Sequence, residues 1–318
     1  GARGCHLRCH AVRRALQESG LAPHWLELEL TESVSMADPE RSVPMMERMK
    51  AIGVSLSIDD FGTGYSNMSY LRRFPIDRLK LDISFVREIT TDPSSLAITD
   101  AVITMAHSLD LEVVAEGVET EGQLAMLGSR NCDIIQGYFF SRPLESADIE
   151  QLLREGRSLP AHLTSRGTEA PMVMLLDDDP LLLDYLSLVL GQEGYEVKAT
   201  PDPLRAFELL ACHEFAVVIC DQRMPAMDGM EFLGRVKSMY PDTIRIAHSA
   251  YDDSLITRDA INRGAVYKFV DKSGDHDELK HVVKDAFEIY LTRRMAKSGT
   301  GAGRSAGDVD LEIGASVE

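Results

Sequence analysis

Short apolar segments alternate with amphipathic ones along most of this chain, and that alternation restricts the possible folds more than any other feature. Strands that alternate with helices at this spacing form βα units in a parallel sheet. In the first half we predict strands at residues 25–30, 54–58, 78–81, 111–115 and 132–135, and helices at 12–19, 38–52, 66–73, 94–110, 120–129 and from Ser146. In the second half we predict strands at 172–176, 195–199, 216–220, 243–247 and 266–270, and helices near 180–193, 202–212, 229–239, 253–262 and 275–293. We therefore expect an α/β fold in both halves.

Two stretches without hydrophobic periodicity divide the chain. Residues 158–170 contain Pro and Gly, and we predict a linker there. The last residues are rich in Gly, Ser, Ala and acids, which predicts a disordered tail over 294–318. A chain of 318 residues can hold two domains with their own cores, and we assign these to 1–157 and 171–293.

Composition excludes several classes of protein. The net charge of −18 argues against a basic surface, so we expect no direct DNA binding. Five scattered cysteines fit a reducing compartment without a disulfide framework, and we predict a cytoplasmic location. No apolar run approaches the roughly 20 residues of a membrane span, and we expect neither a span nor a secretory signal.

The first ten residues carry a Cys and His cluster. Cys5 and Cys9, like His6 and His10, are four residues apart and could share one helical face as metal ligands. Terminal clusters of this kind are usually incidental when no further ligand follows. We therefore predict an irregular start over residues 1–10 and assign no metal there.

The strand predicted at 54–58 ends in two adjacent carboxylates, Asp59 and Asp60. A loop with Gly62 and Gly64 follows, where the backbone can adopt conformations closed to other residues. Acids at a strand end can hold a divalent cation, and a mobile glycine loop can close over a substrate. The alternative is an Asp-rich turn with a glycine exit, which is common.

Polar groups recur at the ends of the other strands in the first half. They are Glu29, Lys80, Glu116 and Gln136. Taken singly, each has an ordinary explanation, such as an exposed strand residue, a solvated stem or a neighbour of a helix N-cap. Their recurrence at every strand end favours a shared site, because the carboxyl ends of barrel strands meet at one mouth.

Motifs along the first half resemble the EAL-type cyclic di-GMP phosphodiesterase, over about residues 12–153. The motifs are Glu29-Leu30-Thr31-Glu32, Asp59-Asp60-Phe61-Gly62-Thr63-Gly64, Leu79-Lys80-Leu81-Asp82, Ala115-Glu116-Gly117-Val118-Glu119, and Gln136-Gly137-Tyr138 with Pro143. The resemblance implies a TIM-like (β/α)₈ barrel. It also implies hydrolysis of cyclic di-GMP to linear pGpG with Mg²⁺ or Mn²⁺.

The same resemblance assigns roles to individual residues. It implies metal ligands at Glu29, Asp59 and Glu116, a second-metal role for Asp60, and catalytic roles for Lys80, Glu116 and Asp59. Lys80 would hold or polarise the attacking water, and Gln136 would contact substrate or the outer shell. Glu32 and Glu119 would anchor the glycine loop and support a dimerisation face, so we expect a homodimer.

One part of the family pattern is not found in these residues. The Glu-Ala-Leu signature and a following Asn, which are metal ligands in the family, would precede Gly1. We therefore expect an incomplete barrel, either a fragment or a truncated domain, without the full two-metal site. The alternative function is a catalytically inactive cyclic di-GMP-binding or protein-docking module.

The second half places another set of charged groups at strand ends. Asp177 and Asp178 follow one predicted strand, Asp221 ends another, and Ser249 and Lys272 follow two more. Ligand sites of open α/β sheets lie at these carboxyl ends. The alternative is an acidic rim on a flavodoxin-like fold, but Asp221 recurs in one motif with Met224-Pro225 and Asp228-Gly229.

Residues 171–293 resemble the response-regulator receiver domain, which implies a flavodoxin-like (βα)₅ fold. The resemblance implies Asp221 as phosphoacceptor, with Mg²⁺ held by Asp177, Asp178, Asp221 and the carbonyl of Arg223. It implies a phospho-switch made by Ser249, Lys272 and Phe269, and a sensor histidine kinase or phosphotransfer protein as partner. Ser273 stands where the family usually has Pro, and we expect a looser Lys272 loop.

Overall fold

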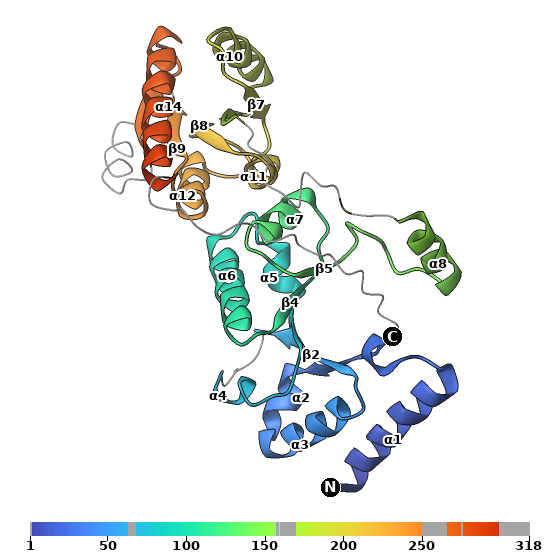
Figure 1. The fold of residues 1–318 in the computed structure, drawn as a ribbon. Helices are drawn as coiled ribbons and strands as arrows, with labels where there is room; N and C mark the ends of the chain where they lie inside the picture. Colours follow the sequence, from blue (N-terminus) through green and yellow to red (C-terminus); the bar gives the residue numbers. More distant parts are fainter. Residues whose placement is uncertain are drawn as a thin grey trace.

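The computed structural model describes residues 2–62, 68–156, 159, 170–249, 266–274 and 276–298. Two five-stranded parallel sheets lie in these residues, one in each half of the chain (Figure 1). The predicted α/β class is therefore confirmed.

The first sheet follows chain order, β1-β2-β3-β4-β5. Its strands are β1 (Glu27–Thr31), β2 (Ser55–Phe61), β3 (Arg78–Leu81), β4 (Glu112–Glu116) and β5 (Ile134–Gln136). Its helices are α1 (Ala2–Ser19), α2 (Glu32–Ala37), α3 (Pro39–Lys50), α4 (Met68–Leu71), α5 (Ile83–Arg87), α6 (Pro93–Ser108), α7 (Glu121–Gly128) and α8 (Ser146–Glu155), with a 3₁₀ turn η1 (Pro23–Trp25). Sequential parallel strands joined by helices form an arc of a (β/α) barrel, the partial barrel that was predicted.

The second sheet has the order β10-β9-β8-β6-β7, the flavodoxin-like arrangement. Its strands are β6 (Met172–Leu176), β7 (Val197–Thr200), β8 (Phe215–Asp221), β9 (Ile244–Ser249) and β10 (Lys268–Asp271). Its helices are α10 (Pro180–Gln192), α11 (Pro203–Cys212), α12 (Gly229–Met239) and α14 (His276–Ser298). Every residue of β8 is buried, as expected for a central parallel strand.

Three helices of the second half begin at an aspartate. Asp179, Asp202 and Asp228 each accept backbone N–H bonds from the first turn of α10, α11 and α12. Pro180 and Pro203 follow two of these caps at the first helical position, where a missing N–H costs nothing. These Asp-Pro and Asp-Gly pairs fix where the helices start.

Several predicted boundaries need correction. The predicted irregular start over residues 1–10 is wrong, because α1 begins at Ala2 in a run with few helix breakers. The short helices α2 and α5 were not predicted, and α14 runs to Ser298, into the predicted tail. The helix predicted at 253–262, nearly all of the predicted linker and the chain after Ser298 lie outside the described residues.

Side chains on β3 hold the amino end of the first sheet together. The guanidinium of Arg78 contacts Glu27 of β1 at 2.6 Å and Glu112 of β4 at 2.7 Å. The next residue, Leu79, is completely buried in the core with Leu56 and Ile58 of β2. The strands are therefore joined by charge on one face and by apolar packing on the other.

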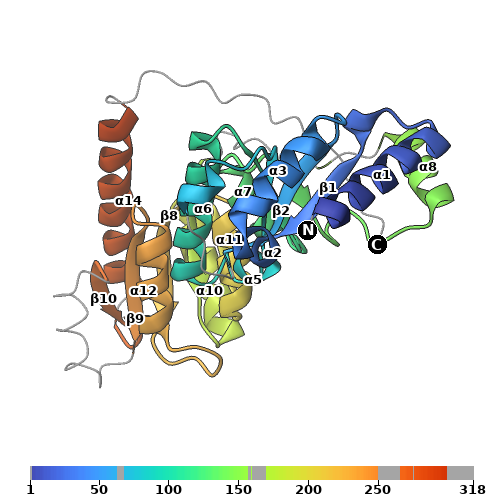
Figure 2. The same ribbon diagram turned by 90° about the horizontal axis from the view of Figure 1, so that it is seen from below.

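The two halves pack against each other. Helix α7 contacts α11, and α6 contacts α12 (Figures 1 and 2). One cluster of buried apolar residues extends through both halves, from Leu79 in the first sheet to Phe207 and Phe232 in the second half. The contact between the halves is therefore partly apolar.

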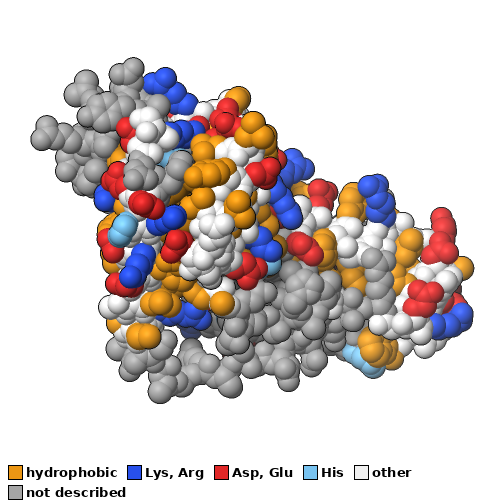
Figure 3. All heavy atoms as spheres, turned by 90° about the horizontal axis from the view of Figure 1, so that it is seen from above, with side chains coloured by type: hydrophobic (Ala, Val, Ile, Leu, Met, Phe, Trp, Pro, Cys, Tyr) orange, Lys and Arg blue, Asp and Glu red, His pale blue; other side chains and the backbone are white. Residues whose placement is uncertain are grey.

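The surface carries both signs of charge. On the described part of the face in Figure 3, Lys and Arg side chains are interspersed with Asp and Glu side chains. Among the helices that the structure describes, none is long and apolar enough to cross a membrane. Among the described residues, Cys9, Cys132, Cys212 and Cys220 form no disulfide bond.

We predict that Phe232→Ala lowers the free energy of unfolding of the second half by about 3–5 kcal/mol. Phe232 is fully buried, and its ring centroid lies 4.7 Å from that of Phe207. Leu188→Ala is the control, because Leu188 on α10 is 62% exposed. Urea denaturation followed by circular dichroism measures both, and equal losses would contradict the packing described.

Candidate metal centres

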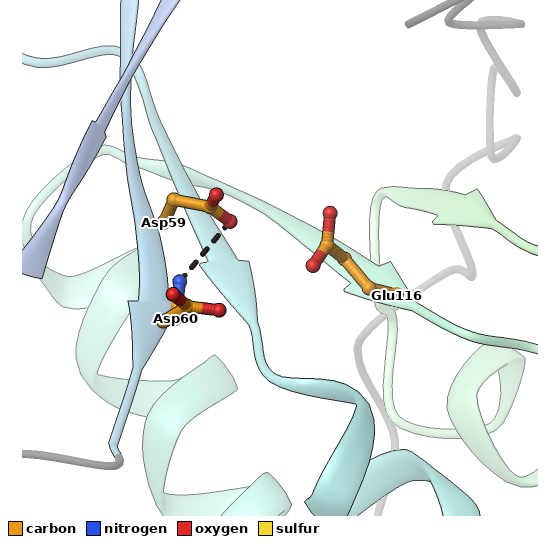
Figure 4. Close-up of side chains that lie close together, drawn as sticks. All are labelled: Asp59, Asp60 and Glu116. Carbon is orange, nitrogen blue, oxygen red and sulfur yellow. Dashed lines mark hydrogen bonds between the residues drawn. The ribbon is translucent and has the colours of Figure 1, made fainter. Parts of the chain in front are cut away.

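Three carboxylates gather at the carboxyl end of the first sheet. Asp59 and Asp60 lie on β2, Glu116 is the last residue of β4, and one oxygen of each lies within 4.8 Å of the others. Figure 4 shows the carboxylates of Asp59 and Glu116 directed into the space between the two strands. The backbone N–H of Asp60 donates to Asp59 Oδ1 at 3.1 Å, and Asp60 adopts a positive φ of 56°.

Lys80 on β3 joins these carboxylates and that of Glu29. Its Nζ lies 2.6 Å from Glu29 Oε1, 2.7 Å from Glu116 Oε1 and 3.3 Å from Asp59 Oδ1. Burial alone would lower the pKa of Lys80, but hydrogen bonds to Glu116 and Glu29 outweigh it and raise that pKa. The ammonium therefore stays charged, and it can only donate hydrogen bonds.

One ammonium does not balance this many acids. Burial raises the pKa of Glu116, Lys80 opposes that shift, and Asp59 adds to it. The pKa of Asp60 is raised by burial and by the negative charges of Asp59 and Asp82. Carboxylate oxygens packed this closely are the hard ligands that Mg²⁺ and Mn²⁺ prefer, so the residues fit a divalent cation.

The glycine loop after β2 is fixed at its start. The N–H of Gly62 donates to Oε2 of the buried Glu32 at 3.0 Å. Gly62 has φ of +100°, and a Cβ there would lie 2.9 Å from Phe85 on α5. Both facts require glycine at this position. Thr63 and Gly64 lie outside the described residues.

The remaining predicted residues of this half lie nearby. Gln136 ends β5 and pairs in register with Glu116. Glu119 is exposed, and its backbone N–H donates to Gln123 Oε1 at 2.7 Å. Asp82 received no role from the sequence, although it lies beside Asp60 and caps α5. Its position just after β3 was the available clue.

A second acidic cluster lies at the carboxyl end of the second sheet. Asp177, Asp178 and Asp221 each place one oxygen within 4.8 Å of the others. Lys272 Nζ contacts Asp177 Oδ2 at 2.8 Å and Asp221 Oδ1 at 2.9 Å. Burial raises the pKa of Asp177, while the hydrogen bonds to both aspartates raise the pKa of Lys272 against the effect of burial.

The other predicted residues of this half surround the cluster. Buried Ser249 ends β9, and its carbonyl accepts from the N–H of Lys272 at 2.9 Å. Phe269 lies half-buried on β10, and Arg223 is exposed just after Asp221. The N–H and hydroxyl of Ser273 both donate to Asp271 Oδ1 at 2.8 Å. Proline could not donate that N–H, so the loop has a constraint that we did not expect.

Comparison with known families finds two separate matched regions in the chain. The family model for the EAL domain matches residues 7–143. The family model for the response regulator receiver domain matches residues 173–284. Each acidic cluster therefore lies within one matched region.

Among curated relatives, the cyclic di-GMP phosphodiesterase NbdA of Pseudomonas aeruginosa is 52% identical over 146 residues, which is 46% of this chain and 19% of that protein. The chain thus spans about a fifth of the length of that relative. The crystal structure of the EAL domain of Mycobacterium smegmatis DcpA shares 40% identity, with a TM-score of 0.45 over 48% of this chain and 68% of that one. The signal receiver domain of a Pseudomonas fluorescens HD domain-containing protein shares 30% identity, with a TM-score of 0.38 over 41% of this chain and 96% of that one.

We predict that Gly117→Ala, next to Glu116, destabilises the first half and that Ile83→Ala partly rescues it. Gly117 has φ of +71°, and a Cβ there would lie 2.2 Å from Ile83 Cγ1. Neighbours that clash should show a coupling of about 0.5–3 kcal/mol in a double-mutant cycle.

Gly156→Ala is the matched control, since Gly156 has φ of +62° but nothing within 4 Å of its missing Cβ. It should show only the conformational cost of about 1 kcal/mol. Denaturation midpoints of the four variants measure both effects. Additive losses in the Gly117 and Ile83 pair would show that the two residues do not touch.

Proposed function

Because the chain belongs to the EAL domain family over residues 7–143 and to the receiver family over residues 173–284, we propose that it serves cyclic di-GMP signalling. The first domain, over 1–157, would bind cyclic di-GMP and hydrolyse it to linear pGpG. The second, over 171–293, would regulate it through phosphorylation of Asp221. The relative NbdA, named a cyclic di-GMP phosphodiesterase, supports this assignment.

The observation that carries the proposal is the Lys80 cluster at the strand ends. Glu29, Asp59 and Glu116 surround one ammonium, with Asp60 beside them. These carboxylates would hold Mg²⁺ or Mn²⁺, which when bound supplies positive charge for the anionic phosphodiester and lowers the pKa of a water. The carboxylates proposed to bind the cation and the lysine proposed to orient the water thus lie together at the carboxyl end of the first sheet.

Lys80 has a distinct part in that chemistry. Its raised pKa keeps it protonated, so it can orient the oxygen of an attacking water but cannot take a proton from it. Its three short contacts leave the Nζ little freedom to move. Glu32 would keep the start of the glycine loop in place through Gly62.

In the receiver, Asp221 is the proposed nucleophile. Its carboxylate oxygen would form the bond to phosphorus while the donor's leaving group departs with the bonding electrons. Asp177 and Asp178 would hold Mg²⁺, Lys272 already lies against Asp221, and Ser249 ends the adjacent strand. A sensor histidine kinase or phosphotransfer protein is the proposed donor, and a homodimer the proposed assembly.

We predict that Glu116→Gln weakens Mn²⁺ binding to the first domain by at least about tenfold and weakens cyclic di-GMP binding with it. The change removes a ligand charge while keeping the side chain's shape. Calorimetric titration with Mn²⁺ and then with cyclic di-GMP measures both affinities.

Glu112→Gln is the matched control, because Glu112 lies on the same strand at its opposite end. Equal affinities in the two variants would contradict the proposed ligand. Chromatography of the products then separates the two functions. Formation of pGpG supports hydrolysis, and tight binding without product supports a binding or docking module instead.

We predict that acetyl phosphate with Mg²⁺ adds one phosphoryl group to the chain and that Asp221→Asn abolishes the addition. Asparagine keeps the shape of the side chain but removes the nucleophilic oxygen. Intact mass spectrometry measures the labelled fraction. Asp184→Asn on the exposed face of α10 is the control and should label normally. Persistent labelling of Asp221→Asn would refute the assignment.

A further inference from the structure

A carboxylate of the receiver lies against the start of a helix in the EAL domain. Glu208 Oε2 on α11 accepts the N–H of Gly122 at 2.9 Å, in the first turn of α7. Glu208 Oε1 accepts the hydroxyl of Thr120 at 3.1 Å and lies 3.4 Å from that of Thr90. Negative charge is favourable at this end of a helix, where free N–H groups concentrate.

The backbone opposite Glu208 is shaped to receive it. A Cβ at Gly122 would lie 2.5 Å from Glu208 Oε2 and 2.8 Å from its Cδ. Only glycine therefore lets the carboxylate approach this closely. Thr120 itself caps α7 by accepting the N–H of Gln123, so Glu208 adds to a complete cap and does not replace it.

A second receiver helix reaches the neighbouring turn. Arg235 Nη1 on α12 donates to the carbonyl of Thr91 at 2.9 Å, while its Nη2 contacts Glu231 at 2.6 Å. Thr91 lies in the turn between α5 and α6, next to Thr90. Glu208 and Arg235 therefore hold the same turn from two receiver helices.

Both contacted segments lead directly to the candidate metal site. The loop from Glu116 leads to Thr120 and then into the first turn of α7, which holds Gly122, and α5 starts just after Lys80 and Asp82. The two segments also touch each other, since Gln123 Nε2 lies 3.4 Å from the carbonyl of Arg87. The two segments also meet where Gly117 packs closely against the side chain of Ile83 at the start of α5. They form one packed unit behind the Lys80 cluster.

The first residue of α12, Gly229, packs against the backbone of Asp221, the proposed phosphoacceptor. A Cβ at Gly229 would lie 1.9 Å from the carbonyl oxygen of Asp221, and the N–H of Gly229 donates to Gln222 at 2.9 Å. One short helix therefore connects the backbone of Asp221 with Arg235 and the turn of the EAL domain. Packed helices are among the elements that can carry coupling between two sites.

We propose that the α11–α12 face of the receiver is its docking surface for the EAL domain, with Glu208 and Arg235 as positioning residues for the loops behind Lys80 and Glu116. One part of this inference rests on the proposed function: phosphorylation of Asp221 would act on the metal site through α12. The docking contact itself does not depend on hydrolysis.

Hydrogen exchange of the full chain tests the contact. In Glu208→Ala the Gly122 amide loses its acceptor, and its exchange should accelerate about tenfold or more. Glu208→Gln, which keeps a weaker acceptor, should give a smaller change. The matched control Glu196→Ala, at an exposed glutamate of the receiver, should leave this amide unchanged. Unchanged exchange in Glu208→Ala would overturn the docking surface.

A second comparison tests whether the contact carries a signal. Beryllofluoride, which imitates a phosphoryl group, is added to the wild type and to Arg235→Ala, and its binding is followed by fluorine NMR. We expect a change of exchange over residues 87–92 and 117–124 in the wild type and a loss of that change in Arg235→Ala. Equal responses in both, or none in the wild type despite binding, would overturn the route through Arg235. If beryllofluoride does not bind, the proposed receiver chemistry is refuted. The hydrogen-exchange result for Glu208→Ala then decides whether the docking surface is correct.

Discussion

The buried ammonium of Lys80 is the interaction on which the first domain depends. It lies on the central strand and contacts carboxylates from β1, β2 and β4. Two residues earlier, Arg78 ties β1 and β4 together at the opposite end of the same strand. Breaking a buried ion pair by removing one partner costs far more than the pair itself contributes, because the other charges stay buried. The face of β3 that carries Arg78 and Lys80 therefore joins its neighbouring strands to one another and also holds the carboxylates of the candidate site.

Much of this arrangement could be predicted from the sequence. Strand period and capping residues are local properties, and β6 has the predicted bounds because Met172–Leu176 is a continuous apolar run. The acids at strand ends also follow from local position, since parallel strands bring their carboxyl ends to one edge. The sequence predicted Glu29, Asp59 and Glu116 near the carboxyl ends of strands, and all three contact Lys80 in the structure, although Glu29 lies in the middle of β1.

The features that could not be predicted from the sequence depend on contacts between segments far apart in the chain. The bond from Glu32 to Gly62 joins residues 30 positions apart, and Glu208 and Thr120 are 88 positions apart. No propensity distinguishes Glu208 from any other glutamate on a helix surface. Helices α2 and α5 were missed for a related reason. Both are short, and short helices are stabilised by packing more than by their own sequence.

Both domains use the same electrostatic arrangement, although their folds differ. Lys272 bridges Asp177 and Asp221 much as Lys80 bridges Glu29 and Glu116. In each case burial alone would lower the pKa of the lysine, and the hydrogen-bonded carboxylates raise it instead. Each lysine opposes the effect of burial, which raises the pKa of Glu116 in one cluster and of Asp177 in the other. Each lysine thereby favours the ionised carboxylate, which is the form that binds a cation. A phosphoryl group on Asp221 would change the charge facing Lys272, and α12 starts on that same backbone. If the proposed phosphorylation occurs, α12 would link that change of charge to the proposed docking surface, because the helix packs against the backbone of Asp221 and carries Arg235.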